Sequence, residues 1–121
     1  IDYPTLRKWY SQCQGVCIPL SGDSDDTCGY TNMLEGMAMA KPIVMTRSGS
    51  LHLNPKDRGF GFIVDPDDSY GWARSMNEII RNPLSSKQMG NQGRMIAESE
   101  FSTERFDNEV LVFLKEILAN N

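Results

Sequence analysis

The residues best suited to bind a ligand are Gly29, Tyr30, Thr31 and Asn32, which lie between an acidic loop and an apolar segment. In an open parallel sheet, ligands bind beyond the carboxyl ends of the strands. A helix that begins there offers unpaired N–H groups and the positive end of its dipole to a phosphate. Gly29 would let such a ligand approach the backbone closely. The alternative is an ordinary helix start that Thr31 or Asn32 caps.

Glu35 is the only ionised side chain in the segment 33–40, which otherwise contains Met, Leu, Gly and Ala. Burying a lone carboxylate is costly unless it is paired or hydrogen-bonded. Near the first helical turn it can point into a crevice and accept hydrogen bonds from two hydroxyls, such as those of a ribose. It can also cap the N-terminus of its own helix. The residues alone leave both roles open.

The elements that position this site are predicted from hydrophobic periodicity. Continuous apolar runs are typical of strands buried on both faces, and apolar residues three or four apart predict helices. We expect strands at 16–20, 42–46 and 60–64, and helices at 1–14, 33–40, 70–81, 85–98 and 103–118.

This order predicts an α/β fold, a Rossmann-like three-layer arrangement around a parallel sheet. A complete doubly wound sheet has about five or six strands, whereas this chain has three predicted strands. The chain therefore looks like half of such a sheet. We expect the last helix to turn one apolar face inward, formed by Phe106, Val110, Phe113, Leu114, Ile117 and Leu118.

Composition limits the classes of protein. The chain has 121 residues, a net charge of −4 and 40% hydrophobic residues, which suits one domain over residues 1–121. A pI near 4.9 argues against a nucleic-acid partner, and no apolar run approaches the ~20 residues of a membrane span. Three cysteines, an odd number, favour reduced thiols and a cytoplasmic protein. The chain opens at Ile1 without Met, so we expect a piece of a longer protein.

Other polar groups have simpler explanations, and we predict no metal site. Cys13, Cys17 and Cys28 are fewer than the four ligands of a structural zinc site. The acidic run 65–68 is explained by capping of the next helix. His52 lies in a polar loop and is interpreted as a solvated side chain.

Several motifs together resemble one enzyme family. The segment GYTNMLEGMAMAKPIV at 29–44 resembles the donor-site signature of GT-B glycosyltransferases, in the family that includes sucrose and glycogen synthases. The runs GFGFIVDPDD at 59–68 and MGNQGR at 89–94, together with Asn82-Pro83 and Phe101-Ser102, fit the same family in the same order. The resemblance covers essentially the whole chain and implies the second half of a GT-B C-terminal, donor-binding domain.

The resemblance also assigns roles to individual residues. In that family, the glutamate at the position of Glu35 hydrogen-bonds the nucleotide ribose, and the backbone at 29–32 meets the donor diphosphate. A further glutamate usually stands eight positions earlier and contacts the sugar, but this chain has Thr27 there. The resemblance therefore implies donor diphosphate or sugar contacts at Thr27 and 29–32. It names no catalytic residue in this segment.

The activity implied by the resemblance is retaining transfer of a sugar from a nucleotide-diphosphate sugar to a hydroxyl acceptor. Backbone N–H groups and basic residues would stabilise the departing diphosphate, with no cofactor. An N-terminal acceptor domain and the first half of the donor domain would be further partners, so we expect the isolated chain to be inactive. The rival hypothesis is a non-catalytic module, either a degenerate sugar-nucleotide binder or a structural interaction domain, which Thr27 favours. The parent enzyme would be cytoplasmic or lie at the inner face of a membrane.

The missing half of the sheet suggests an exposed strand edge at 16–20. Val16, Cys17 and Ile18 carry no charge that would protect such an edge from pairing. We therefore expect the isolated chain to dimerise through this edge or by exchange of the N-terminal helix. The alternative is that residues 1–14 fold back and cover the edge.

Overall fold

The computed structural model describes residues 1–21, 28–49 and 51–121. Within these residues, helices and strands alternate in the first two thirds of the chain, and helices alone follow. The elements are α1 (Tyr3–Gln12), β1 (Val16–Ile18), α2 (Tyr30–Ala38), β2 (Ile43–Thr46), β3 (Gly61–Val64), α3 (Ser69–Arg81), α4 (Pro83–Glu100) and α5 (Thr103–Ala119).

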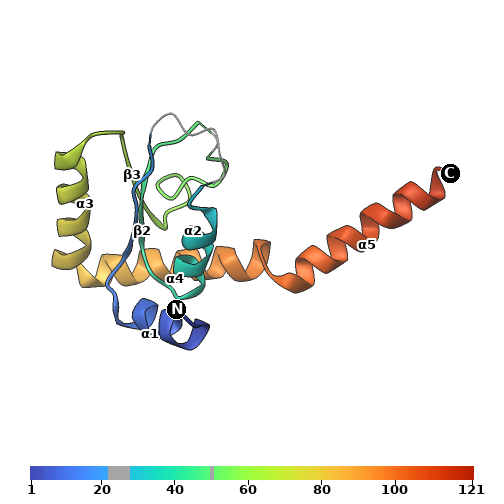
Figure 1. The fold of residues 1–121 in the computed structure, drawn as a ribbon, viewed down its shortest axis with the longest axis horizontal. Coiled ribbons are helices and arrows are strands. Elements are labelled where there is room, and N and C mark those ends of the chain that lie inside the picture. Colours follow the sequence, from blue (N-terminus) through green and yellow to red (C-terminus); the bar gives the residue numbers. More distant parts are fainter. Residues whose placement is uncertain (22–27, 50) are drawn as a thin grey trace.

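The three described strands form one parallel sheet in the order β1-β2-β3. The register pairs Cys17 with Val44, and Val44 with Phe62. Helix α3 lies on one side of the sheet, whereas α2 lies on the other, and α4 runs past one end of the strands (Figure 1). The expected α/β fold with a three-layer parallel sheet is confirmed.

The core is divided between the two faces of the sheet because side chains alternate along a strand. On one face, Ile43 and Met45 of β2 belong to a cluster that includes Met33 and Met37 of α2. On the other face, Val44 packs in a second cluster with Val64 of β3 and Ile79 of α3. Every residue of β2 is buried, as the continuous apolar run predicted.

Glycines allow α2 to approach its neighbours closely. A Cβ atom at Gly36 would lie 2.7 Å from Ile43 Cδ1 on the sheet. A Cβ atom at Gly90 of α4 would lie 2.0 Å from the carbonyl oxygen of Ala40, which follows α2. Helix α2 is thus held tightly between the sheet and α4.

Two element boundaries differ from the expected residue ranges. Helix α2 begins at Tyr30 with Gly29 as its N-cap, so the prediction that Thr31 or Asn32 caps it is wrong. Strand β1 occupies only the first part of the apolar run at 16–20 and ends at Ile18, as Pro19 predicts, because proline has no N–H for the ladder.

A third boundary is that of α4, which starts at Pro83, two residues before the expected Ser85. Proline suits the first helical turn, where its missing N–H would have no partner. The same preference places Pro4 in the first turn of α1, where it was expected.

The prediction that α5 faces inward is wrong. The helix exists where expected, but it leaves the body of the molecule after Phe101 and projects away from it (Figure 1). None of its residues is buried, and Phe106 and Phe113 are 66% and 61% exposed. Periodicity shows that a helix has an apolar face, but it does not show whether another element covers that face. No described element covers this one.

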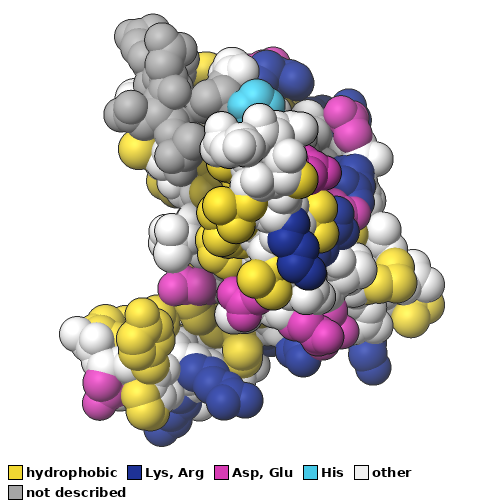
Figure 2. Space-filling view, turned by 90° about the vertical axis from the view of Figure 1, so that its right-hand side faces the viewer, with side chains coloured by type: hydrophobic (Ala, Val, Ile, Leu, Met, Phe, Trp, Pro, Cys, Tyr) yellow, Lys and Arg dark blue, Asp and Glu magenta, His cyan; other side chains and the backbone are white. Residues whose placement is uncertain are grey.

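The surface on the α5 side is mixed in character. Hydrophobic side chains lie there between acidic and basic ones (Figure 2). Among the described helices, none has the length and apolar character needed to cross a membrane.

Candidate functional site

Gly29 begins the site because it sets the start of α2. Its φ of +84° lies in the left-handed region, and its carbonyl accepts the N–H of Met33 at 2.9 Å. A Cβ atom there would lie 2.7 Å from Ile18 Cγ2 and 3.2 Å from Met45 Cε. Glycine is therefore required by both conformation and packing. Gly29 has no side chain with which to cap the helix, and the N–H groups of a first helical turn are the kind of group that binds an anion.

The three residues after Gly29 divide between structural and exposed positions. The hydroxyl of Tyr30 accepts hydrogen bonds from the N–H groups of His52 at 2.6 Å and Leu53 at 3.3 Å. Tyr30 thus ties α2 to the loop after β2. Thr31 and Asn32 are exposed in the first turn of α2. Thr27, the expected sugar contact, lies outside the described residues.

Glu35 lies one helical turn after Thr31 and Asn32 on the same side of α2. Its side chain is half-buried, and its Oε2 accepts a hydrogen bond from the Tyr10 hydroxyl at 2.8 Å. Glu35 is the sixth residue of the helix, beyond the turn in which a capping carboxylate is found. The capping interpretation is therefore wrong, and the carboxylate is held by a residue of α1.

The hydrogen bond has a clear effect on its donor. Burial first, and then the hydrogen bond to Glu35, raise the pKa of Tyr10 to about 12. Tyr10 therefore keeps its proton at neutral pH and remains a donor to the carboxylate.

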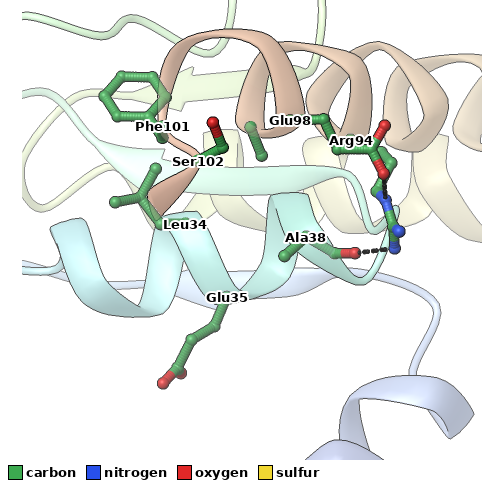
Figure 3. Close-up of a pocket in the computed structure, with 8 residues that line it drawn as sticks. Leu34, Glu35, Ala38, Arg94, Glu98, Phe101 and Ser102 are labelled. Atoms are coloured by element: carbon green, nitrogen blue, oxygen red, sulfur yellow. Dashed lines mark hydrogen bonds and ion pairs between the residues drawn. The ribbon is translucent and has the colours of Figure 1, made fainter. Parts of the chain in front are cut away.

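Two hollows flank Glu35. The larger, of about 440 Å³, lies between α2 and the end of α4 and is lined by Leu34, Ala38 and Phe101 among others. Arg94 in its wall already binds the Ala38 carbonyl and Glu98, and the Glu35 side chain points away from α4 (Figure 3).

The smaller hollow, of about 200 Å³, lies between α1 and α2. It is lined by Tyr3, Leu6, Arg7, Tyr10, Glu35, Ala38 and Met39. The carboxylate of Glu35 accepts the hydrogen bond of Tyr10 on this side, so the polar end of Glu35 lies at the α1–α2 hollow.

The remaining candidates have structural partners. Asp68 is the N-cap of α3 and accepts the Gly71 N–H at 2.8 Å, which confirms the capping interpretation for this residue. Arg47 and Asp65 form an exposed ion pair of 2.6 Å. The three cysteines are free thiols. In the described residues, no three of the His, Cys, Asp and Glu side chains gather into a group that could hold a metal ion.

Comparison with known families decides the class of protein. Residues 2–82 match the sequence model of the family described as glycosyl transferases group 1. The chain belongs to the group 1 glycosyltransferases. This confirms the resemblance drawn from the motifs at 29–44 and 59–68.

Two mannosyltransferases are similar to this chain over much of its length. An alpha-1,3/1,6-mannosyltransferase, ALG2, of Dictyostelium discoideum is 29% identical over 84 residues, which are 69% of this chain and 20% of that protein. The O-antigen chain mannosyltransferase C of Escherichia coli is 29% identical over 97 residues, 78% of this chain and 25% of its own length. The chain thus spans about a quarter or less of these relatives.

Solved structures support the fold. Sucrose-phosphate synthase from Thermosynechococcus elongatus superimposes with a TM-score of 0.83 at 21% identity, over 100% of this chain and 29% of that protein. The Anabaena protein HepE, in complex with UDP, superimposes with a TM-score of 0.73 at 18% identity, over 90% of this chain and 29% of its own. The described sheet and helices therefore have the same fold as part of each of these two solved structures.

Tyr10 is the residue of the site that sequence reasoning missed. It lies 25 positions before Glu35, and its spacing from other apolar residues predicts only that it belongs to the apolar face of the first helix. The available signal was the carboxylate itself, because a half-buried glutamate among apolar neighbours needs a hydrogen-bond donor. The hydroxyls of tyrosines in neighbouring helices were candidates for that donor.

Proposed function

We propose that the chain is the donor-binding part of a retaining glycosyltransferase that transfers a sugar from a nucleotide-diphosphate sugar to a hydroxyl acceptor. One observation carries the proposal: the Glu35 carboxylate lies on the same side of α2 as Thr31 and Asn32, one turn further along the helix from its N-terminal residues. The family match supports the reaction class. The retaining outcome follows from the resemblance to sucrose and glycogen synthases.

The arrangement suits the parts of a nucleotide-diphosphate sugar. The N–H groups and dipole of the first turn would bind the diphosphate and stabilise the charge that develops on it as the sugar leaves. Glu35 stands four residues after Thr31, about 6 Å further along the helix axis at 1.5 Å per residue. That separation is of the size that divides a diphosphate from the ribose diol in a nucleotide, and a carboxylate can accept both hydroxyls.

The names of the similar proteins indicate which nucleotide and which sugar should be tested first. The UDP complex of HepE makes UDP the first nucleotide, and the two mannosyltransferases make mannose the first sugar. Because the chain spans 29% of each solved structure, we propose that an acceptor domain and the other half of the donor domain complete the enzyme. The isolated chain would then bind donor without transferring sugar. Free thiols at all three cysteines agree with a cytoplasmic location, or one at the inner face of a membrane.

A second candidate is a non-catalytic module that binds sugar nucleotides weakly or serves as an interaction domain. Thr27, which replaces the sugar-contacting glutamate of the family pattern, favours it. Transfer of mannose by a longer chain that includes residues 1–121 would contradict this candidate. Nucleotide binding without transfer by that longer chain would support it.

Calorimetric titration of the chain with UDP, GDP and ADP tests the proposed ribose contact. A hydrogen bond to a charged group contributes ~1.5–3 kcal/mol, so Glu35→Ala should weaken binding of the preferred nucleotide about ten- to hundredfold. The matched 2′,3′-dideoxy nucleotide should bind wild type and variant equally. Unchanged affinity with a lowered melting temperature would instead assign Glu35 a purely structural role.

A further inference from the structure

We propose that Tyr10 is a positioning residue for Glu35, and that α1 therefore forms part of the donor site. The inference rests on the proposed function, because it assumes that Glu35 accepts the ribose hydroxyls. Tyr10 would act through the carboxylate, with no contact to the nucleotide required. Its role is to hold Glu35 in one orientation before the ligand arrives.

The geometry of the contact supports this role. The Tyr10 hydroxyl donates to Oε2 of Glu35 at 2.8 Å, across the gap between α1 and α2. A carboxylate has two oxygens that accept about four hydrogen bonds. In the described residues, Oε2 accepts one hydrogen bond, from the Tyr10 hydroxyl, and no hydrogen bond reaches Oε1. Most of the accepting capacity of Glu35 thus stays free for a diol.

The end of α1 that carries Tyr10 is anchored to the body of the protein. The ammonium group of Lys41, which follows α2, donates to the Ser11 carbonyl at 3.1 Å. Within the last turn of α1, the Cys13 thiol donates to the Tyr10 carbonyl at 3.2 Å. Figure 1 shows α1 close to the end of α2 where the helix runs toward β2. The Lys41 contact thus keeps the end of α1 that carries Tyr10 beside the segment that follows α2.

Preorganisation explains why such a contact would strengthen binding. A free glutamate side chain loses rotational freedom when it binds a ligand, and this loss lowers affinity. The hydrogen bond to Tyr10 restricts Glu35 in the folded protein, before ligand binds. The pKa of Tyr10, raised to about 12 by burial and by Glu35, keeps the donor protonated over the pH range in which binding is measured.

The same hydrogen bond could in principle weaken nucleotide binding, and the two possibilities predict opposite changes in affinity. If the hydrogen bond instead held Glu35 away from the ribose, the ligand would have to break it. Removing the Tyr10 hydroxyl would then strengthen nucleotide binding. Positioning predicts the reverse sign.

The test is Tyr10→Phe in the full 121-residue chain, with calorimetric titration of UDP and of 2′,3′-dideoxy-UDP. The variant keeps the ring and removes only the hydroxyl. We expect the Kd for UDP to rise about three- to tenfold, and the Kd for the dideoxy nucleotide to stay unchanged. On a Glu35→Gln background, the same substitution should have no further effect on UDP binding.

Tyr70→Phe is the matched control, because Tyr70 lies in α3, does not line the α1–α2 hollow and is 75% exposed. It should leave both affinities unchanged. The inference, but not the proposed ribose contact, is overturned if Glu35→Gln weakens UDP binding while Tyr10→Phe leaves it unchanged or makes it tighter. UDP binding that Glu35→Gln leaves unchanged, or no binding of UDP at all, overturns the proposed ribose contact and the inference with it.

Discussion

Single residues in this chain serve the fold and the candidate site together. Glu35 is held by Tyr10 through one hydrogen bond, and Gly29 both starts α2 and fits against the ends of β1 and β2. A substitution at either position therefore changes stability as well as ligand contacts. Predictions at this scale need matched controls that separate the two effects.

The pKa of Tyr10 predicts a loss of stability at alkaline pH. A tyrosine in the unfolded chain titrates near pH 10, whereas Tyr10 titrates near 12 in the folded protein. Its contribution is fully present below pH 10 and is lost as the pH rises toward 12, because only the unfolded chain releases the proton there. After allowance for screening by solvent, we expect a loss of about 1 kcal/mol.

Urea denaturation of wild type and Tyr10→Phe at steps between pH 9 and about 11.5 measures this effect. The free energy of unfolding should fall more steeply with pH in wild type than in the variant. Tyr3→Phe, an exposed position, should follow the wild-type curve. Parallel curves for wild type and Tyr10→Phe would show that the pKa of Tyr10 is not raised in the folded protein.

Gly29 and Gly59 form a second matched pair. Both have positive φ, +84° and +76°, but a Cβ at Gly59 meets only Gln92 Cγ at 3.9 Å, whereas one at Gly29 meets Ile18 at 2.7 Å. Gly59→Ala should cost about 1 kcal/mol for the conformation alone. Gly29→Ala should cost about 2–3 kcal/mol, because the clash adds to the strain.

Chemical denaturation compares the two glycine variants directly. Equal losses would mean that the Ile18 side chain moves aside freely. Whatever the outcome, a substitution at Gly29 is a poor probe of phosphate binding, because its effect on the fold accompanies any effect on the ligand. Thr31 and Asn32, which are exposed, are cleaner positions for that purpose.

At the scale of elements, α2 determines the geometry of the site. It carries Thr31, Asn32 and Glu35, and it is packed between the sheet and α4. Close packing at Gly36 and Gly90 fixes its position. The orientation of Glu35 toward α1 is therefore a consequence of how α2 is clamped.

Gly90 and Gly93 of α4 test this clamping. A Cβ at Gly90 would lie 2.0 Å from the backbone oxygen of Ala40, whereas one at Gly93 would lie 3.3 Å from Met37 Cγ and from Phe60 Cβ. Gly90→Ala requires a backbone shift and should cost about 3 kcal/mol or more. Gly93→Ala should cost about 1 kcal/mol or less.

Thermal unfolding followed by circular dichroism measures the difference between the two α4 variants. Gly90→Ala should lower Tm by about 10 °C and Gly93→Ala by a few degrees at most. Similar melting temperatures would show that α2 and α4 separate without cost, and would contradict the clamping of α2 by α4.

At the scale of the whole molecule, two apolar surfaces are uncovered among the described residues. Strand β1 lies at an edge of the described sheet, and its Cys17 is exposed. Helix α5 projects from the body of the molecule with large apolar side chains in contact with solvent. Natural proteins cover or charge such edges and patches. The residues of β1 carry no charge, and no described element covers the apolar face of α5.

We therefore expect the isolated chain to self-associate, as measured by light scattering over a range of concentrations. Two variants identify the surface: Cys17→Lys adds a charge to the β1 edge, and Phe113→Glu adds one to α5. The variant that restores a monomer marks the surface that pairs. A wild-type monomer at all concentrations, with no binding of a dye for exposed apolar surface, would contradict the prediction.

The sequence by itself determined the elements with strong local patterns. The apolar run at β2 predicted a strand buried on both faces, and Asp68 predicted the start of α3. Both signals act over a few residues, through alternation of side chains or through a cap on the nearest turn. The motifs around Glu35 likewise identified the family, because they follow one another along the chain.

Only the tertiary structure decided which surfaces meet. The start of α2 at Gly29 depends on space between Ile18 and Met45, and the partner of Glu35 comes from α1, 25 residues away. The apolar face of α5 was visible in the sequence, but its exposure was not. Periodicity shows that one face of a helix is apolar, but packing between distant segments decides whether another element covers that face. The same packing decides which polar group forms a hydrogen bond with a half-buried charge such as that of Glu35.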